Sequence, residues 1–132
     1  MRIFWAAAGA AILMCGVARA EAPSAGSGDA AVGVGIICNT PDEARQFVGL
    51  RRSGAEADQA MHAVNDSAHD ERACGVAAIA YIRDATVDTM KLDNRLVQIV
   101  RINVVAGFNG SSWQRVSDMV QYAVLEGGGE AI

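Results

Sequence analysis

LVQIVRINVVA, residues 96–106, is the clearest secondary-structure signal in this chain and decides its fold. β-Branched residues fill it, and the side chains of a strand alternate between two faces. One face carries Leu96, Gln98, Val100, Ile102 and Val104, and the other carries Val97, Ile99, Arg101, Asn103 and Val105. The stretch therefore predicts a strand whose first face is the better core candidate, although Gln98 interrupts it.

The residues after this strand predict a hairpin. Phe108-Asn109-Gly110-Ser111 contains an Asn-Gly pair, which readily adopts the positive φ angles of tight turns. A last strand over residues 113–125 then pairs back in the antiparallel direction. Gly127-Gly128-Gly129 ends the ordered part, so residues 127–132 are expected to form a disordered tail.

The residues before this strand complete a meander. Residues 75–82 are an apolar run, residues 86–92 alternate loosely, and Asp93-Asn94 supplies a turn into residue 96. Together with the strands over residues 96–106 and 113–125, these segments predict a four-stranded antiparallel meander.

Two helices precede the meander. Thr40-Pro41-Asp42-Glu43 combines a capping hydroxyl, a proline at the first helical position and a glutamate three residues after the cap. The helix is expected to stop near Ser53-Gly54, where residues 53–56 form a second capping box. Apolar residues then recur at helical spacing as far as Ala68, while Asn65-Asp66-Ser67 weakens the end of this second helix.

A short apolar strand over residues 30–38 comes before the helices. Its glycines, Gly33 and Gly35, do not complete a phosphate-binding fingerprint, and they allow another backbone to approach closely. The sequence thus predicts one α+β domain over residues 30–126: a short N-terminal strand, two helices, then the four-stranded meander. We expect the helices to cover one face of a curved sheet or to plug the end of a small open barrel.

The first twenty residues have the pattern of a signal peptide. Met1-Arg2 is positive, residues 3–17 are uncharged and mostly apolar, and Ala18-Arg19-Ala20 has small residues where a signal peptidase reads. The apolar run is shorter than the ~20 residues of a spanning helix. We therefore expect a periplasmic or secreted protein without a membrane span after signal removal, beginning with a flexible Gly/Ser-rich leader over residues 21–29. Met14 before Cys15 argues against lipidation, which is the alternative interpretation of this segment.

Signal removal leaves nine basic and fifteen acidic residues, and the basic residues are scattered. A nucleic-acid-binding surface normally has a basic stripe, so nucleic acid is not an expected partner. Two cysteines remain, Cys38 and Cys74, in a compartment that oxidises thiols. One structural disulfide is the simplest interpretation. A free thiol pair is the alternative, against which there is no Cys-x-x-Cys motif and no histidine close in sequence to either cysteine.

His62, Asp66 and His69 form the one constellation that suggests chemistry, because imidazole and carboxylate groups ligate zinc or copper. The two histidines are ~10.5 Å apart along a continuous helix, so one ion requires the helix to bend or end between them. The alternative interpretation is a solvated polar helix face. No catalytic residues and no cofactor are predicted, since the chain lacks a Gly-x-Ser-x-Gly elbow and its paired carboxylates are sequence neighbours that point apart.

Trp113 and Tyr122 are candidate binding anchors, because large aromatic side chains supply contact area at low entropic cost. Filling the core of the sheet is the alternative role for both. The turn at Asn109-Gly110 is a second candidate contact site.

Several segments resemble short exported proteins of alpha-proteobacteria: Thr-Pro-Asp-Glu-Ala from residue 40, Ala63-Val64-Asn65 before Ala73-Cys74-Gly75-Val76-Ala77, and the run from Val97 through Trp113 to Gln121-Tyr122. The resemblance implies a periplasmic setting and one disulfide, and it implies no activity. We therefore expect a non-enzymatic module that binds a protein or another envelope component through its sheet face or its hairpin. An inhibitor of a secreted hydrolase and a metal-binding protein using His62, Asp66 and His69 are the alternatives.

Overall fold

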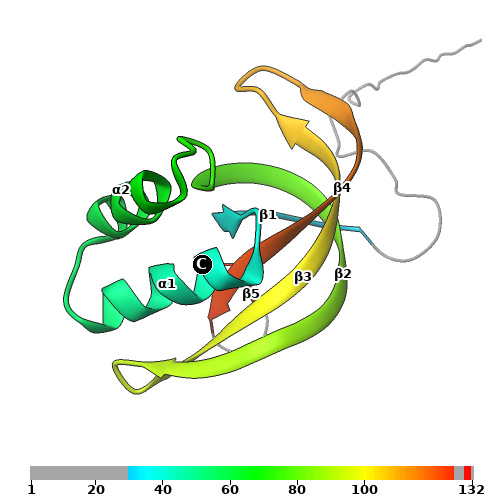
Figure 1. The fold of residues 1–132 in the computed structure, drawn as a ribbon. Helices are drawn as coiled ribbons and strands as arrows, with labels where there is room; N and C mark the ends of the chain where they lie inside the picture. The colour runs from blue at the N-terminus through cyan, green and yellow to red at the C-terminus, as the bar shows by residue number, and fades with distance from the viewer. Residues whose placement is uncertain (1–29, 127–129, 132) are drawn as a thin grey trace, which may run out of the picture.

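The structure is a computed structural model that describes residues 30–126 and 130–131. The expected signal peptide and leader lie outside the described residues. In chain order the elements are β1 (Ala31–Cys38), α1 (Pro41–Arg52), α2 (Ala57–Ala68), β2 (Cys74–Leu92), β3 (Arg95–Phe108), β4 (Trp113–Glu126) and β5 (Glu130–Ala131) (Figure 1). Two helices and an antiparallel sheet confirm the predicted α+β class.

The strands form one antiparallel sheet that closes on itself. Its order is β1-β2-β3-β4-β5, and β1 also pairs with β4 through residues 36–38. β1 therefore joins the two sides of the β2-β3-β4 meander. The prediction of four strands in the meander was wrong, because the meander has three and the strand before the helices completes the sheet.

β2 is a single strand where the sequence predicts two. It runs for 19 residues, straight through the expected break between residues 82 and 86. Its register against β3 shifts at Ala80/Tyr81, Arg83/Ala85 and Thr86/Asp88. Bulges of this kind bend a strand without ending it. The polar residues in the middle of β2 therefore mark its curvature, which Figure 1 shows, and not a break between two strands.

Apolar side chains are buried on both faces of the sheet. Consecutive residues such as Ile99 and Val100, or Ala123 and Val124, belong to different clusters. Neighbours on a strand point to opposite faces, so the two clusters lie on opposite sides of the sheet. The helices pack on the first cluster, which includes Ile36, Phe47, Val48, Val97, Ile99 and Val124. The second is built from Ile79, Tyr81, Val100, Ile102, Val104, Ala123 and Leu125.

This burial corrects the predicted core face of residues 96–106. Val100, Ile102 and Val104 are buried as expected, but Leu96 is 45% exposed, and Val97 and Ile99 are fully buried beneath the helices. A strand covered on both faces is apolar on both, so its sequence is nearly continuously apolar and its alternation does not identify one core face.

Capping sets the helix boundaries. Thr40 caps α1 with the predicted capping box: its hydroxyl accepts from the Glu43 N–H at 3.1 Å, and its own N–H donates to Glu43 Oε1 at 3.1 Å. The predicted second box at Ser53 was wrong. Ser53 is the C-cap of α1, and its hydroxyl donates to Gly49 O. α2 begins later, where the Glu56 N–H donates to Gln59 Oε1 at 3.1 Å.

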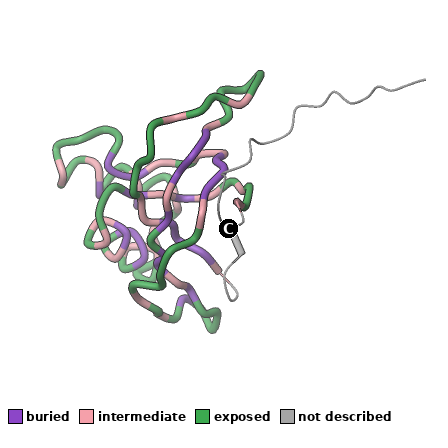
Figure 2. The backbone as a smooth tube through the Cα atoms, turned by 90° about the vertical axis from the view of Figure 1, so that its right-hand side faces the viewer, coloured by how far each residue is buried: buried purple, intermediate pink, exposed green. Residues whose placement is uncertain are grey.

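The predicted tail contains β5. Glu130 pairs with Glu126, and Ala131 pairs with Leu125, so the sheet extends beyond β4. Residues 127–129 and 132 lie outside the described residues. Figure 2 shows the buried residues in the middle of the molecule, with the tips of the hairpins and loops exposed.

Candidate functional site

A disulfide joins the end of β1 to the start of β2. Cys38 and Cys74 are directly opposite each other in the β1–β2 ladder, and their Cα atoms are 4.0 Å apart. The two residues are 0% and 2% exposed. The predicted disulfide is confirmed, and its burial keeps the sulfur atoms from the thiolate chemistry that a reactive pair needs.

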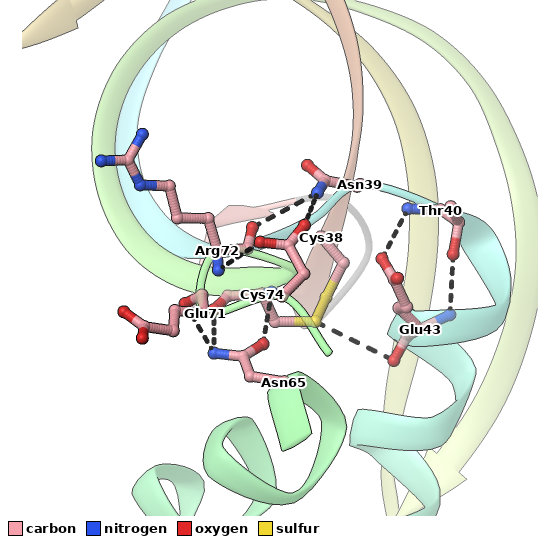
Figure 3. The surroundings of a disulfide bond; sticks show 9 residues. Cys38, Asn39, Thr40, Glu43, Asn65, Glu71, Arg72 and Cys74 are labelled. Atoms are coloured by element: carbon pink, nitrogen blue, oxygen red, sulfur yellow. Dashed lines mark hydrogen bonds between the residues drawn. A yellow bond between two sulfur atoms is a disulfide. The ribbon is translucent and has the colours of Figure 1, made fainter. Parts of the chain in front are cut away.

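Polar groups fix the loop between α2 and β2 against the end of β1 (Figure 3). The Asn39 side-chain amide donates to Arg72 O at 3.3 Å and to Asp70 Oδ2 at 3.4 Å. Asp70 Oδ1 accepts from the Arg72 N–H at 2.9 Å, and the Asn39 N–H donates to Ala73 O at 2.8 Å. The disulfide corner is therefore a rigid junction of β1, α2 and β2.

The β3–β4 hairpin projects from the sheet, at the top of Figure 1. Its tip is organised by Asn109, whose Oδ1 accepts from the N–H groups of Ser111 at 2.9 Å and Ser112 at 3.0 Å. Gly110 takes a positive φ of 101°, whereas Asn109 does not belong to the left-handed region and acts through its side chain. The predicted turn is present. Gly110 alone adopts the positive φ that was expected of both residues, and Asn109 stabilises the turn through its side chain.

The two helices leave part of their own side of the sheet bare. Val32 and Val34 are 55% and 54% exposed, and Val76 is 60% exposed. Val32, Val34 and the helix-covered Ile36 alternate along β1 and share one face, and Val76 lies opposite Ile36 on β2. The face extends across the sheet, since Val32 lies opposite Ala80 and Ala80 lies opposite Ala106. We call this surface the uncovered apolar face, formed by Val32, Val34, Val76, Ala78, Phe108 and Trp113.

Phe108 and Trp113 end this face at the base of the hairpin tip. They are cross-strand partners, with ring centroids 5.4 Å apart and planes tilted by 56°. Phe108 is 41% exposed, while Trp113 is half-buried against the small cluster of Ala80, Val105 and Ala106. Trp113 therefore has both of the roles weighed for it, because part of the indole packs on the sheet and part lies at the surface.

Tyr122 lies elsewhere. It is opposite Cys38 on β4 and packs, half-buried, against the helix-covered cluster. The two predicted aromatic anchors are thus not brought together. The valines of β1 and β2 were missed by sequence reasoning, although the Val-Gly alternation of residues 32–35 places both valines on one face.

His62, Asp66 and His69 are exposed along α2 and at its C-cap. His69 ends the helix in the left-handed conformation, with φ 54°. A shallow hollow is lined by Asp66 and His69 together with Asn65, Asp70 and Glu71, and His62 is not part of it. Within residues 30–126 and 130–131, no group of three or more His, Cys, Asp or Glu side chains is arranged to hold a metal ion.

One ion-pair cluster ties α1 to β2. Arg45 Nε donates to Asp88 Oδ2 at 2.8 Å, and Arg45 Nη1 donates to Asp42 Oδ1 at 2.8 Å. The hydrogen bond from Arg45 is the main cause that lowers the pKa of Asp88, and the Thr89 N–H adds to it. The same bond raises the pKa of Arg45. Both groups are stabilised in their charged forms, which suits an ion pair and not a general acid or base at neutral pH.

Comparisons with known protein families, with characterised proteins and with solved structures find no match for this chain. In the part of the chain that the structure describes, no helix is long and apolar enough to cross a membrane.

Proposed function

We propose that this protein is an exported binding module of the periplasm, and that a protein partner docks on the uncovered apolar face. The observation that carries the proposal is the exposure of Val32, Val34 and Val76 on the side of the sheet that the helices cover only in part. Contiguous apolar surface of this kind marks interaction sites on proteins that are otherwise well packed.

The composition of the face supports a protein partner. Its six residues carry no charge, and charged residues are depleted at the centres of protein interfaces. The Phe108–Trp113 pair supplies rigid aromatic area at one end, and aromatic residues are over-represented among the positions that dominate binding energy. The disulfide fixes β1 against β2, so the valines of both strands are held in place before a partner arrives.

Site-specific crosslinking in the source cells tests the docking surface. A photoreactive residue replaces Val34 or Phe108, and Thr89, which is exposed on β2 outside the face, is the matched control position. We expect the same crosslinked partner from both face positions and none from Thr89. Equal crosslinking from all three positions, or none from either face position, would contradict the proposal.

Export is tested separately by the intact mass of the protein purified from the periplasmic fraction. A mass corresponding to residues 21–132 less two hydrogens supports both cleavage after Ala20 and an oxidised cysteine pair. Recovery of the full-length chain in the cytoplasm would remove the periplasmic part of the proposal and leave the docking surface to its own test.

A further inference from the structure

A small hollow lies between α1 and the helix-covered face of the sheet. Its volume is about 70 Å³. Its walls are mostly apolar side chains that are themselves buried: Ile36, Phe47, Val48, Leu92, Val97 and Val124. It is separate from the uncovered apolar face, because none of the six residues of that face lines it.

The size of the hollow limits what fits. An apolar cavity of roughly 150 Å³ accommodates benzene. A space of about half that volume takes an aliphatic chain of about three to five carbons and not an aromatic ring. Water gains little there, because these apolar walls offer it few hydrogen-bond partners.

The charges at the hollow favour an anion. Arg51 and Glu126 are the ionisable residues of the lining. Glu126 Oε1 accepts from Arg95 Nη1 at 2.9 Å, so its charge is already paired. Arg51 donates from Nη1 to the neutral Ala55 O at 2.9 Å, and no carboxylate pairs with Arg51 among the described residues. A guanidinium has five N–H donors and binds carboxylates in a forked geometry, so Arg51 retains the capacity to bind one.

We propose that this hollow binds a small aliphatic carboxylate, with the aliphatic end among Phe47, Leu92 and Val97 and the carboxylate on Arg51. Two kinds of molecule share this chemistry: a free short-chain fatty acid, and the C-terminal leucine of a peptide with its α-carboxylate. The inference stands apart from the proposed docking of a protein on the uncovered apolar face, and either can fail without the other.

The test is a titration of the oxidised, mature protein followed by its backbone amide NMR signals. The probes are butyrate, hexanoate and hexanamide, with acetyl-Gly-Gly-Leu and its C-terminal amide as the peptide arm. We expect saturable shifts of the amides of Val48, Val97 and Val124. Affinity should rise about fourfold for each methylene added from butyrate until the hollow is full. Hexanoate should bind at least tenfold more tightly than hexanamide.

Two variants test the contributions of the probe's aliphatic chain and of its carboxylate separately. Arg51→Gln should abolish the preference for acid over amide while leaving hexanamide binding unchanged. Ala57→Leu places a larger side chain at the lining and should weaken every probe, whereas Ala63→Leu, on the exposed side of α2, should change none. Tighter binding of hexanoate than of acetyl-Gly-Gly-Leu indicates a free fatty acid as the ligand, and tighter binding of acetyl-Gly-Gly-Leu indicates a peptide C-terminus. Equal affinity for acid and amide, shifts confined to residues outside the hollow, or no saturable shift with any probe would overturn the proposal.

Discussion

The side chain of Asn65 pairs with the backbone of Cys74 as a neighbouring strand would. Asn65 Oδ1 accepts from the Cys74 N–H at 2.8 Å, and Asn65 Nδ2 donates to Cys74 O at 3.2 Å and to Glu71 O at 3.0 Å (Figure 3). Because Cys74 is 2% exposed, its polar backbone groups depend on such partners. The residue expected to weaken the end of α2 is therefore the one that docks α2 onto the start of β2.

Asn65→Ala is expected to lower the free energy of unfolding by about 1–3 kcal/mol, because it leaves buried backbone groups of Cys74 without partners. Urea unfolding followed by circular dichroism measures the change. Ser67→Ala, an exposed site on the same helix, is the control and should change stability by less than about 0.5 kcal/mol. An Asn65→Ala variant as stable as the control would show that the pairing contributes nothing.

Removal of the disulfide is the second prediction. The bridge closes a loop with a sequence separation of 36 residues, which corresponds to about 4 kcal/mol in the chain-entropy estimate. The Cys38→Ala/Cys74→Ala double variant should therefore unfold at markedly lower urea than the oxidised protein. Reductant should shift the wild-type midpoint in the same direction and leave that of the double variant unchanged. Identical midpoints for the oxidised and reduced wild type would show that the bridge does not stabilise the fold.

The disulfide could be predicted from the number of cysteines, and the start of the first helix from a few adjacent residues. The two cysteines outside the predicted signal peptide leave one intramolecular pairing, and Thr40, Pro41 and Glu43 define a helix start by themselves. The closure of the sheet has no local signal, because the pairing of Ile36 with Val124 joins residues far apart in the chain. The sequence predicted two strands where β2 is one bulged strand for a related reason, since a polar interruption looks the same at a bulge and at a strand end.

The uncovered apolar face, too, could be predicted from the sequence only in part. Trp113 and the hairpin turn could be selected from residue type, whereas the exposure of Val32, Val34 and Val76 depends on how far the helices reach across the sheet. That reach is set by tertiary packing of α1 and α2 near the disulfide. The sequence shows that these valines are apolar and cannot show that they are left uncovered.

The Arg45–Asp88 pair predicts a pH dependence of stability. The folded protein lowers the pKa of Asp88 below its ordinary value of 3.8, chiefly through the hydrogen bond from Arg45. The pair therefore stabilises the fold above about pH 3.8, and this contribution is lost as the pH falls through the lowered folded pKa. Asp88→Asn should be less stable than the wild type at pH 7, and the difference should shrink in acid.

Urea midpoints measured between pH 7 and pH 2 check this dependence. Asp118→Asn is the control, because Asp118 is an exposed strand carboxylate with no ion pair among the described residues. The control should follow the wild-type curve throughout. A difference between Asp88→Asn and the wild type that persists unchanged at the lowest pH would mean that the charge of Asp88 is not its cause.

Two glycines predict stability changes of opposite sign. Gly49 lies on the exposed side of α1, and a Cβ built there meets no atom within 4 Å. Gly49→Ala should therefore stabilise the protein by about 0.5–1 kcal/mol, because alanine has the higher helix propensity. A Cβ at Gly110 also meets nothing within 4 Å, but its φ of 101° lies in the left-handed region, which residues with a side chain rarely adopt. Gly110→Ala should therefore destabilise the protein by about 1 kcal/mol, from backbone conformation alone.

Thermal unfolding of both variants separates conformation from packing, since space is open at both sites. A rise in Tm for Gly49→Ala and a fall for Gly110→Ala are expected. Gly110→Asn is the matched control, because asparagine tolerates positive φ better than alanine and should recover part of the loss. If Gly110→Ala were as stable as the wild type, the positive φ of Gly110 would not be what holds the hairpin tip in its conformation. The tip would then not fix the positions of Phe108 and Trp113 at its base.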